Sequence, residues 1–189
     1  MSRGYSDRFD PDRAISRSRS RVDCLRRSLL IAAATATLLG SIGNFAEAAS
    51  FRQGVSAFNR QEYLLASQNF FPLAEQGDPG AQTYLGFMFE TGRGVPKNYT
   101  EAAMWYRRAA EQGDSLAQYS LGLLYDKGQG VPQDIVEANK WLNLSTAAAP
   151  RRTREARARI RDAVTTKMTR GEIARARLRA LEWVPTRER

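Results

Sequence analysis

The sequence predicts an all-α fold: an α-solenoid of tandem helix-turn-helix units with a C-terminal two-helix cap. The first observation behind this is an internal repeat, since residues 81–106 shifted by 36 positions onto 117–142 agree at eleven of 26 positions. The others are apolar residues at helical spacing and helix-capping residues around them. A fixed period of 20–50 residues is typical of stacked arrays, in which each unit buries its apolar face against its neighbours.

The first helix of each copy is marked at both ends. Asp78 and Asp114 are suited to cap its start, and Pro79 fits the first turn, where its missing N–H costs nothing. Apolar residues then recur at positions 81, 85, 88 and 89, which is helical spacing, and Gly92 is expected to end the helix. We therefore expect a helix from about residue 79 to 91, and an equivalent one 36 residues later.

A Gly-x-Gly-Val-Pro loop and a second helix complete each copy. Asn98-x-x-Glu101 and Asp134-x-x-Glu137 have the spacing of a capping box, in which the two side chains satisfy free N–H groups reciprocally. The second helices carry Trp105 and Trp141 at equivalent positions. We predict that both tryptophans lie in the core.

The repeated pattern resembles a known family. Ala-Gln-x-x-Leu-Gly-x-x-Phe/Tyr-x-x-Gly-x-Gly-Val-Pro, followed by Ala-x-x-Trp, occurs twice and is similar to the Sel1-like repeat, a longer relative of the tetratricopeptide motif. The resemblance gives full copies at 81–116 and 117–150 and a degenerate copy at 51–80. It implies a bacterial exported Sel1-repeat protein that acts as a non-enzymatic interaction scaffold or adaptor in the cell envelope, with a protein or peptide as partner.

The N-terminal part has the composition of an export signal. Residues 1–27 are a basic, disorder-prone region, either a cytoplasmic extension or sequence upstream of a start site near Val22. Residues 28–48 supply an apolar core and the site Ala46-Glu47-Ala48, which predicts a signal peptide cleaved after Ala48 and a periplasmic or secreted protein. The alternative is an uncleaved inner-membrane anchor, which would be the chain's only membrane contact.

The positive charge is concentrated at the two ends of the chain. The net charge is +9, and residues 151–189 contain thirteen basic and five acidic side chains. Residues 151–185 are predicted to form the two-helix cap, before a tail at 186–189. Ala156, Ile160, Val164 and Met168 suggest the packed stripe of its first helix, with arginines around the rest, and Thr169-x-x-Glu172 opens the second.

The composition argues against most catalytic chemistry. The chain has no histidine, and its single cysteine, Cys24, precedes the predicted cleavage site. Histidine bases, thiol nucleophiles and the usual zinc sites are therefore excluded from the mature chain. Gly92-x-Gly94 follows a helix and lacks a phosphate-binding lysine, so it predicts a turn rather than a nucleotide loop. We expect no enzyme activity, cofactor or metal, and no nucleic-acid partner.

The candidate binding site is a strip on the first helices, which line the concave surface of tetratricopeptide-like arrays. The strip has apolar and aromatic groups edged by carboxylates, and could hold a peptide or partner helix. The alternative is that Phe87 and Leu123 pack on the preceding second helix. A rival function is attachment to anionic lipid or an envelope polymer through the basic C-terminal helices. The six strip residues are Thr83, Phe87 and Glu90 in the first copy, and Tyr119, Leu123 and Asp126 in the second.

Overall fold

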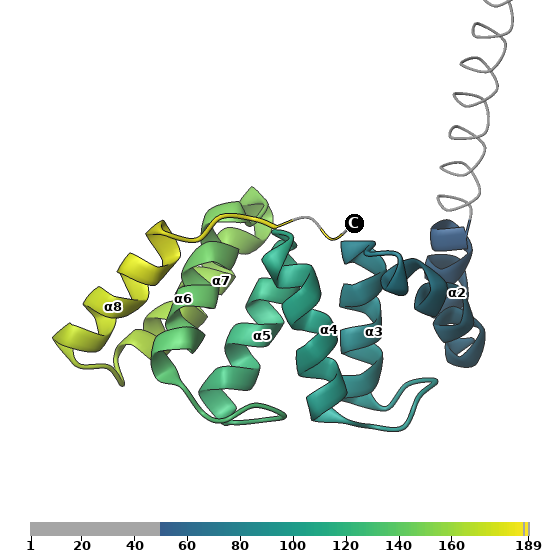
Figure 1. Ribbon diagram of the computed structural model, residues 1–189, viewed down its shortest axis with the longest axis horizontal. Coiled ribbons are helices and arrows are strands. Elements are labelled where there is room, and N and C mark those ends of the chain that lie inside the picture. Colours follow the sequence, from purple (N-terminus) through teal and green to yellow (C-terminus); the bar gives the residue numbers. More distant parts are fainter. Residues whose placement is uncertain (1–49, 187, 189) are drawn as a thin grey trace, which may run out of the picture. The chain divides into compact units, whose positions relative to one another are not determined.

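The structure is a computed structural model that describes residues 50–186 and 188. Within these residues every regular element is a helix (Figure 1). The predicted n-region at 1–27 and signal peptide at 28–48 lie outside the described residues. The elements are a helical segment at 50–59, α2 (Tyr63–Glu75), α3 (Pro79–Thr91), α4 (Tyr99–Glu111), α5 (Ser115–Lys127), α6 (Ile135–Ala148), α7 (Arg151–Thr165) and α8 (Arg170–Leu181).

The helices stack in chain order, which confirms the predicted α-solenoid. Each repeat is a helix pair, α3 with α4 and α5 with α6, and successive pairs meet through α2 against α3 and α4 against α5. No helix within residues 50–186 has the length and apolar character needed to cross a bilayer. The same residues contain no group of three or more Asp, Glu, His or Cys side chains placed to hold a metal ion.

The local signals for helix ends are confirmed in the structure. The Asp78 carboxylate accepts a hydrogen bond from the Ala81 N–H at 2.7 Å, and α3 begins at Pro79. Asp114 caps α5 in the same way, through the Ala117 N–H at 2.7 Å. Gly92 ends α3 in the left-handed conformation, with φ 74°. Short-range capping chemistry therefore sets the limits of these helices.

Only one of the expected capping boxes closes reciprocally. Asn98 and Asp134 cap α4 and α6 through the N–H groups of the next turn. The Glu137 carboxylate, however, pairs with Lys140 at 3.2 Å and with Arg179 of α8 at 2.7 Å. A full box forms at Thr169 and Glu172, at the start of α8. Charged partners across the α6–α8 interface explain why Glu137 is drawn away from its own helix start.

The two predicted core tryptophans are buried, Trp105 at 6% and Trp141 at 4% exposed. Two helical glycines allow the paired helices to approach closely. A Cβ added at Gly86 would come within 2.6 Å of the Tyr106 ring, and one at Gly122 within 2.9 Å of the Leu142 side chain. The tight pairing of α3 with α4, and of α5 with α6, therefore depends on these glycines.

Each Gly-x-Gly loop joins the two helices of one repeat and packs against the repeat before it. Gly94 and Gly130 have φ values of 73° and 70°, which favour glycine. A Cβ at Gly94 would collide with the backbone carbonyl of Tyr63, and one at Gly130 with that of Tyr99. Each loop thus lies against the first residue of the preceding second helix, which explains both glycines without any ligand.

The cap differs in detail from its prediction. α7 and α8 both pack on α6. In α7, Val164 is buried and Met168 just beyond the helix is half-buried, as expected, but Ala156 and Ile160 are exposed. The face turned to the repeats instead includes Arg157, whose Nη1 donates to the Ser115 carbonyl and the Ser145 hydroxyl, both at 2.9 Å. The sequence pattern places Arg157 outside the packed stripe, but its long side chain reaches polar groups of α5 and α6.

Candidate functional site

The first helices enclose an apolar hollow of about 310 Å³ on the side where the binding strip was predicted. The helical segment 50–59, α3 and α5 supply most of its walls, and α4 contributes one side chain. The lining residues are Phe58, Gly80, Thr83, Tyr84, Phe87, Tyr106, Asp114, Leu116 and Ser120.

Aromatic contacts fix one wall of this hollow. The Phe58 ring meets Tyr84 and Phe87 edge-on, with centroid separations of 5.2 and 5.8 Å. Tyr84 also stacks on the buried Phe70 ring at 4.6 Å. The Arg93 guanidinium lies 5.4 Å from the centre of the Phe87 ring. Because each ring is held by another, this wall is preorganised, which reduces the entropy that binding must remove.

Two of the six predicted strip residues line the hollow. Thr83 is buried, and its hydroxyl donates to the Pro79 carbonyl at 2.8 Å, so its hydrogen-bonding capacity is used inside its own helix. Phe87 is half-buried and also contacts the core between α4 and α5. Phe87 therefore packs against segment 50–59 and the α4–α5 core, whereas the alternative placed it on the preceding second helix.

The second-copy residues face the cap. The Arg157 guanidinium lies 5.6 Å from the centre of the Tyr119 ring. The Asp126 carboxylate pairs with Lys167 at 2.9 Å, and Leu123 is half-buried on the same face of α5 by helical spacing. The six predicted residues therefore do not form one open strip, since the cap engages Tyr119 and Asp126.

The predicted acidic edge is occupied by internal contacts. The Tyr106 hydroxyl donates to the Glu90 carboxylate at 2.8 Å. Burial, followed by the Glu90 charge, raises the pKa of Tyr106, so its phenol remains a proton donor over the physiological range. Asp114 caps α5, and Asp126 is neutralised by Lys167. Apolar contact, more than negative charge, is what this hollow offers to a partner.

Leu116, which the repeat pattern does not mark, lies at the mouth of the hollow. Its side chain is 51% exposed although it is large and apolar. The equivalent residue in the first copy is Gly80, so comparison of the two copies showed no apolar position there. Phe58 lies in the degenerate copy, where it keeps the repeat pattern, so the sequence alone does not mark it as a site residue. Leu116 and Phe58 belong to different copies, so they are recognised only when the helix faces of neighbouring repeats are considered together.

A second apolar hollow of about 330 Å³ lies between α6 and α8. Its walls come from the last helix of the second repeat and from the cap, including Leu144, Ala180 and Leu181. Leu181 is 84% exposed. This hollow does not draw on successive repeats, so we do not place the main binding site there.

Comparisons with known proteins agree with the repeat pattern. The Sel1 repeat family matches residues 79–114 and 115–149. The chain is similar to the crystal structure of c5321, a protective antigen of uropathogenic Escherichia coli strains with an SLR fold, at 31% identity and a TM-score of 0.66. It is also similar to a Sel1 repeat protein from Oxalobacter formigenes, at 28% identity and a TM-score of 0.56.

These similarities extend over part of each protein. Each of the two alignments covers 72% of this chain. The chain itself spans 29% of the length of the E. coli antigen and 55% of the length of the Oxalobacter protein. The comparison with curated proteins gave no match. The two matched segments coincide with the helix pairs α3–α4 and α5–α6. The chain therefore contains two Sel1 repeats, at residues 79–114 and 115–149.

Proposed function

We propose that this chain is an exported, non-enzymatic scaffold of the cell envelope that binds a peptide or partner helix in the apolar hollow between segment 50–59, α3 and α5. Sel1 repeats generally mediate protein–protein interactions. The hollow supports the proposal because it is open, apolar and built from successive repeats. An enzyme is disfavoured by the absence of histidine and by the single cysteine at position 24.

The half-exposed Leu116 beside the rigid aromatic wall is the observation that carries this proposal. A large apolar side chain at the mouth of an apolar hollow loses water contact when a partner covers it, and such centrally placed contacts supply most of the affinity at interfaces. Only about half of the Leu116 surface packs against the rest of the fold, since 51% of it is exposed. It therefore reports on partner binding with little effect on folding.

Site-specific photo-crosslinking in the native cells tests the proposal. A benzophenone amino acid at position 116 should give one dominant adduct with another protein, which mass spectrometry then identifies. Position 178 is the matched control, because Leu178 on α8 is apolar and 55% exposed. Adducts at 178 and none at 116 would contradict the assignment of the hollow.

Export rests on the sequence of residues 26–48 and has its own test. We propose cleavage after Ala48 and a periplasmic or secreted mature chain, because a basic flank, an apolar core and an Ala-x-Ala site occur in that order. Fractionation followed by N-terminal sequencing should give a chain that starts at Ala49. A chain that retains residues 26–48 in the membrane fraction would favour the inner-membrane anchor.

A second candidate is attachment to anionic lipid or an envelope polymer through the cap. Leu178, Leu181 and Val184 are exposed in a segment rich in arginine, which is the mixed character that a membrane surface attracts. Several cap arginines, however, already have acidic partners, among them Arg159 with Glu155. Binding to anionic vesicles that falls steeply with salt would support this candidate, and a groove scaffold should show none.

A further inference from the structure

The turns between repeats form a second surface, separate from the hollow, and the end of the chain lies on it. After α8 the chain runs back along the helix array toward α3, as Figure 1 shows in yellow. Three anchors hold residues 183–186 and 188. The Trp183 ring meets Trp141 edge-on at 6.3 Å, the Thr186 N–H donates to the Glu111 carbonyl at 2.9 Å, and the Glu188 carboxylate enters a polar site at α4.

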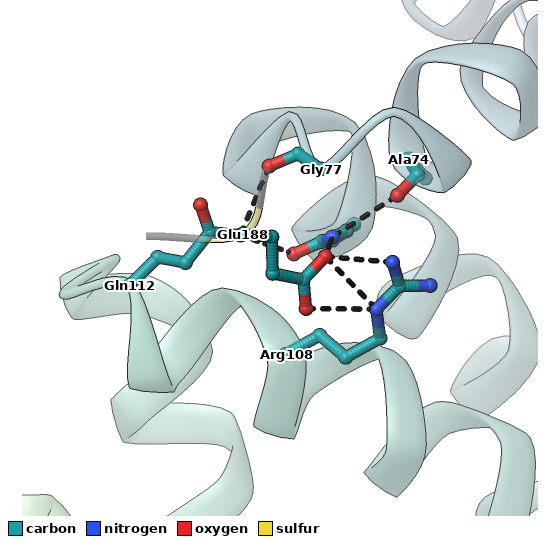
Figure 2. Close-up of polar contacts among 6 residues, drawn as sticks. Ala74, Gly77, Arg108, Gln112 and Glu188 are labelled. Carbon is teal, nitrogen blue, oxygen red and sulfur yellow. Dashed lines mark hydrogen bonds and ion pairs between the residues drawn. The ribbon is translucent and has the colours of Figure 1, made fainter. Parts of the chain in front are cut away.

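The Glu188 site is made by residues that bind its carboxylate from two sides. Arg108 Nη2 donates to Oε2 at 2.6 Å and Arg108 Nε donates to Oε1 at 2.9 Å, a fork geometry typical of carboxylate recognition (Figure 2). The Gln82 amide donates to Oε2 at 2.8 Å. Gln82 is completely buried, so this contact comes from the floor of the site.

The site is organised by the repeats themselves. The Gln112 amide donates to the Gly77 carbonyl and to Gln82 Oε1, both at 2.9 Å, which fixes the Gln82 side chain. Gln82 also donates to the Ala74 carbonyl at 3.0 Å. The Arg108 guanidinium lies 4.8 Å from the centre of the Trp105 ring. The donors therefore have their positions without help from the tail, which is the preorganisation that a binding site needs.

The turns at Gly77 and Gly113 are equivalent in the two repeats, but the side chains around them differ, and so do the groups that they bind. Gly77 and Gly113 occupy equivalent turns with φ values of 95° and 96°. The tail closes on both, with Glu188 next to Gly77 and Trp183 next to Gly113. The second turn has Leu144 and Ala148 where the first has Arg108 and Gln112. The first site thus suits a carboxylate and the second an aromatic ring.

We propose that this surface is a binding site for an extended peptide segment with an aromatic residue and, five positions later, a carboxylate. Its resident occupant is the chain's own tail, anchored through Trp183, Thr186 and Glu188. Between Trp183 and Thr186 the tail lies on the surface, with Val184 72% exposed and Pro185 also exposed. A segment held at three points can be exchanged for another of the same chemistry. A partner peptide competes with a tail whose effective concentration is on the order of millimolar.

The test begins by releasing the tail in the otherwise intact chain with Glu188→Lys. Amide hydrogen exchange at Thr186 reports release, because its N–H is bonded to Glu111 when the tail is bound. A labelled peptide with the sequence of residues 183–189 is then added, and fluorescence anisotropy measures binding. We expect it to bind the Glu188→Lys chain at least about tenfold more tightly than the parent chain, whose own tail competes.

Two controls assign the effect to the carboxylate site. The same peptide with Gln in place of Glu188 should bind roughly tenfold more weakly, and Arg108→Gln in the Glu188→Lys chain should have the same effect. Should Glu188→Lys fail to fold by circular dichroism, Arg108→Gln in the parent chain must release the Thr186 amide instead. Continued protection of Thr186 in the released variants, or no peptide binding once the tail is released, would overturn the proposal.

Discussion

At the scale of single residues, close packing between paired helices depends on positions where the repeat has no room for a side chain. Gly86 is a helical residue, and alanine is the better helix former in isolation. The Tyr106 ring, however, occupies the space where a Cβ would lie. Tyr106 is 1% exposed and is held by its bond to Glu90, so it has little freedom to move away. Packing therefore outweighs helix propensity at this position.

Gly86→Ala should lower the free energy of unfolding by about 1–3 kcal/mol, because an added methyl group overpacks the contact with Tyr106. Gly171→Ala in α8 is the matched control, since nothing lies within 4 Å of its added Cβ. That variant should be neutral or more stable by up to about 1 kcal/mol. Urea melts of both variants make the comparison, and equal effects would show that the α3–α4 contact is looser than described.

Trp105→Ala should cost about 3–5 kcal/mol, because a buried aromatic side chain is removed and the cavity relaxes only in part. Trp105→Phe should cost less. The ring is retained, and the indole N–H has no hydrogen-bond acceptor among the described residues, so no hydrogen bond is lost. A denaturant melt of Trp105→Ala that matches the parent chain would place this residue on the surface. It would also contradict the assignment of which face of α4 is turned to the core.

At the scale of elements, features set by residues close in sequence can be predicted, whereas contacts between distant residues cannot. The ends of α3 follow from Asp78, Pro79 and Gly92, which act within one helical turn. The repeat itself predicts which helices pair. Arg157 could not be assigned this way, because its partners Ser115 and Ser145 are 42 and 12 residues away and belong to other helices. Leu116 was hidden because its counterpart is Gly80.

The same limit applies to the tail and to the candidate strip. Glu188 binds Arg108 and Gln82, 80 and 106 residues earlier, and no periodic pattern connects them. The division of the strip follows from the cap, since Lys167 and Arg157 lie against α5 only after the chain has folded. Sequence thus predicted the helices and their order, and tertiary contacts decided which parts of the predicted strip stay open.

Arg157→Ala should loosen α7 and cost about 1–3 kcal/mol, because it removes hydrogen bonds to the Ser115 carbonyl and the Ser145 hydroxyl at a half-buried position. Arg159→Ala on the same helix is the matched control. Its side chain is 77% exposed and, among the described residues, pairs with Glu155 alone, so the cost should stay below about 0.5 kcal/mol. Hydrogen exchange across α7 would separate the two, and equal exchange rates would mean that Arg157 does not anchor the cap.

At the scale of the whole molecule, the tail links the last helix to the first full repeat. The pKa of Glu188 lies below its ordinary value of 4.5, chiefly because Arg108 donates hydrogen bonds to its carboxylate. The carboxylate is therefore favoured in the folded chain. It stabilises the bound tail above pH 4.5, and that stabilisation is lost as the pH falls through the lowered pKa.

Protection of the Thr186 amide should consequently fall as the pH drops below about 4.5, after correction for the intrinsic exchange rate. In Glu188→Gln the protection should be weaker at neutral pH and should change little over the same range. This control separates Glu188 from other carboxylates that titrate in acid. An identical pH dependence in both chains would assign the effect to another group.

Calorimetry with the protein identified by crosslinking at position 116 tests most directly whether the hollow between segment 50–59, α3 and α5 holds the partner. Leu116→Ala should weaken binding by at least about tenfold, which is about 1.4 kcal/mol, while the melting curve stays close to that of the parent chain. Leu178→Ala, of similar exposure on α8, should leave the affinity unchanged. Unchanged affinity in Leu116→Ala, or a loss confined to Leu178→Ala, would contradict binding in the hollow.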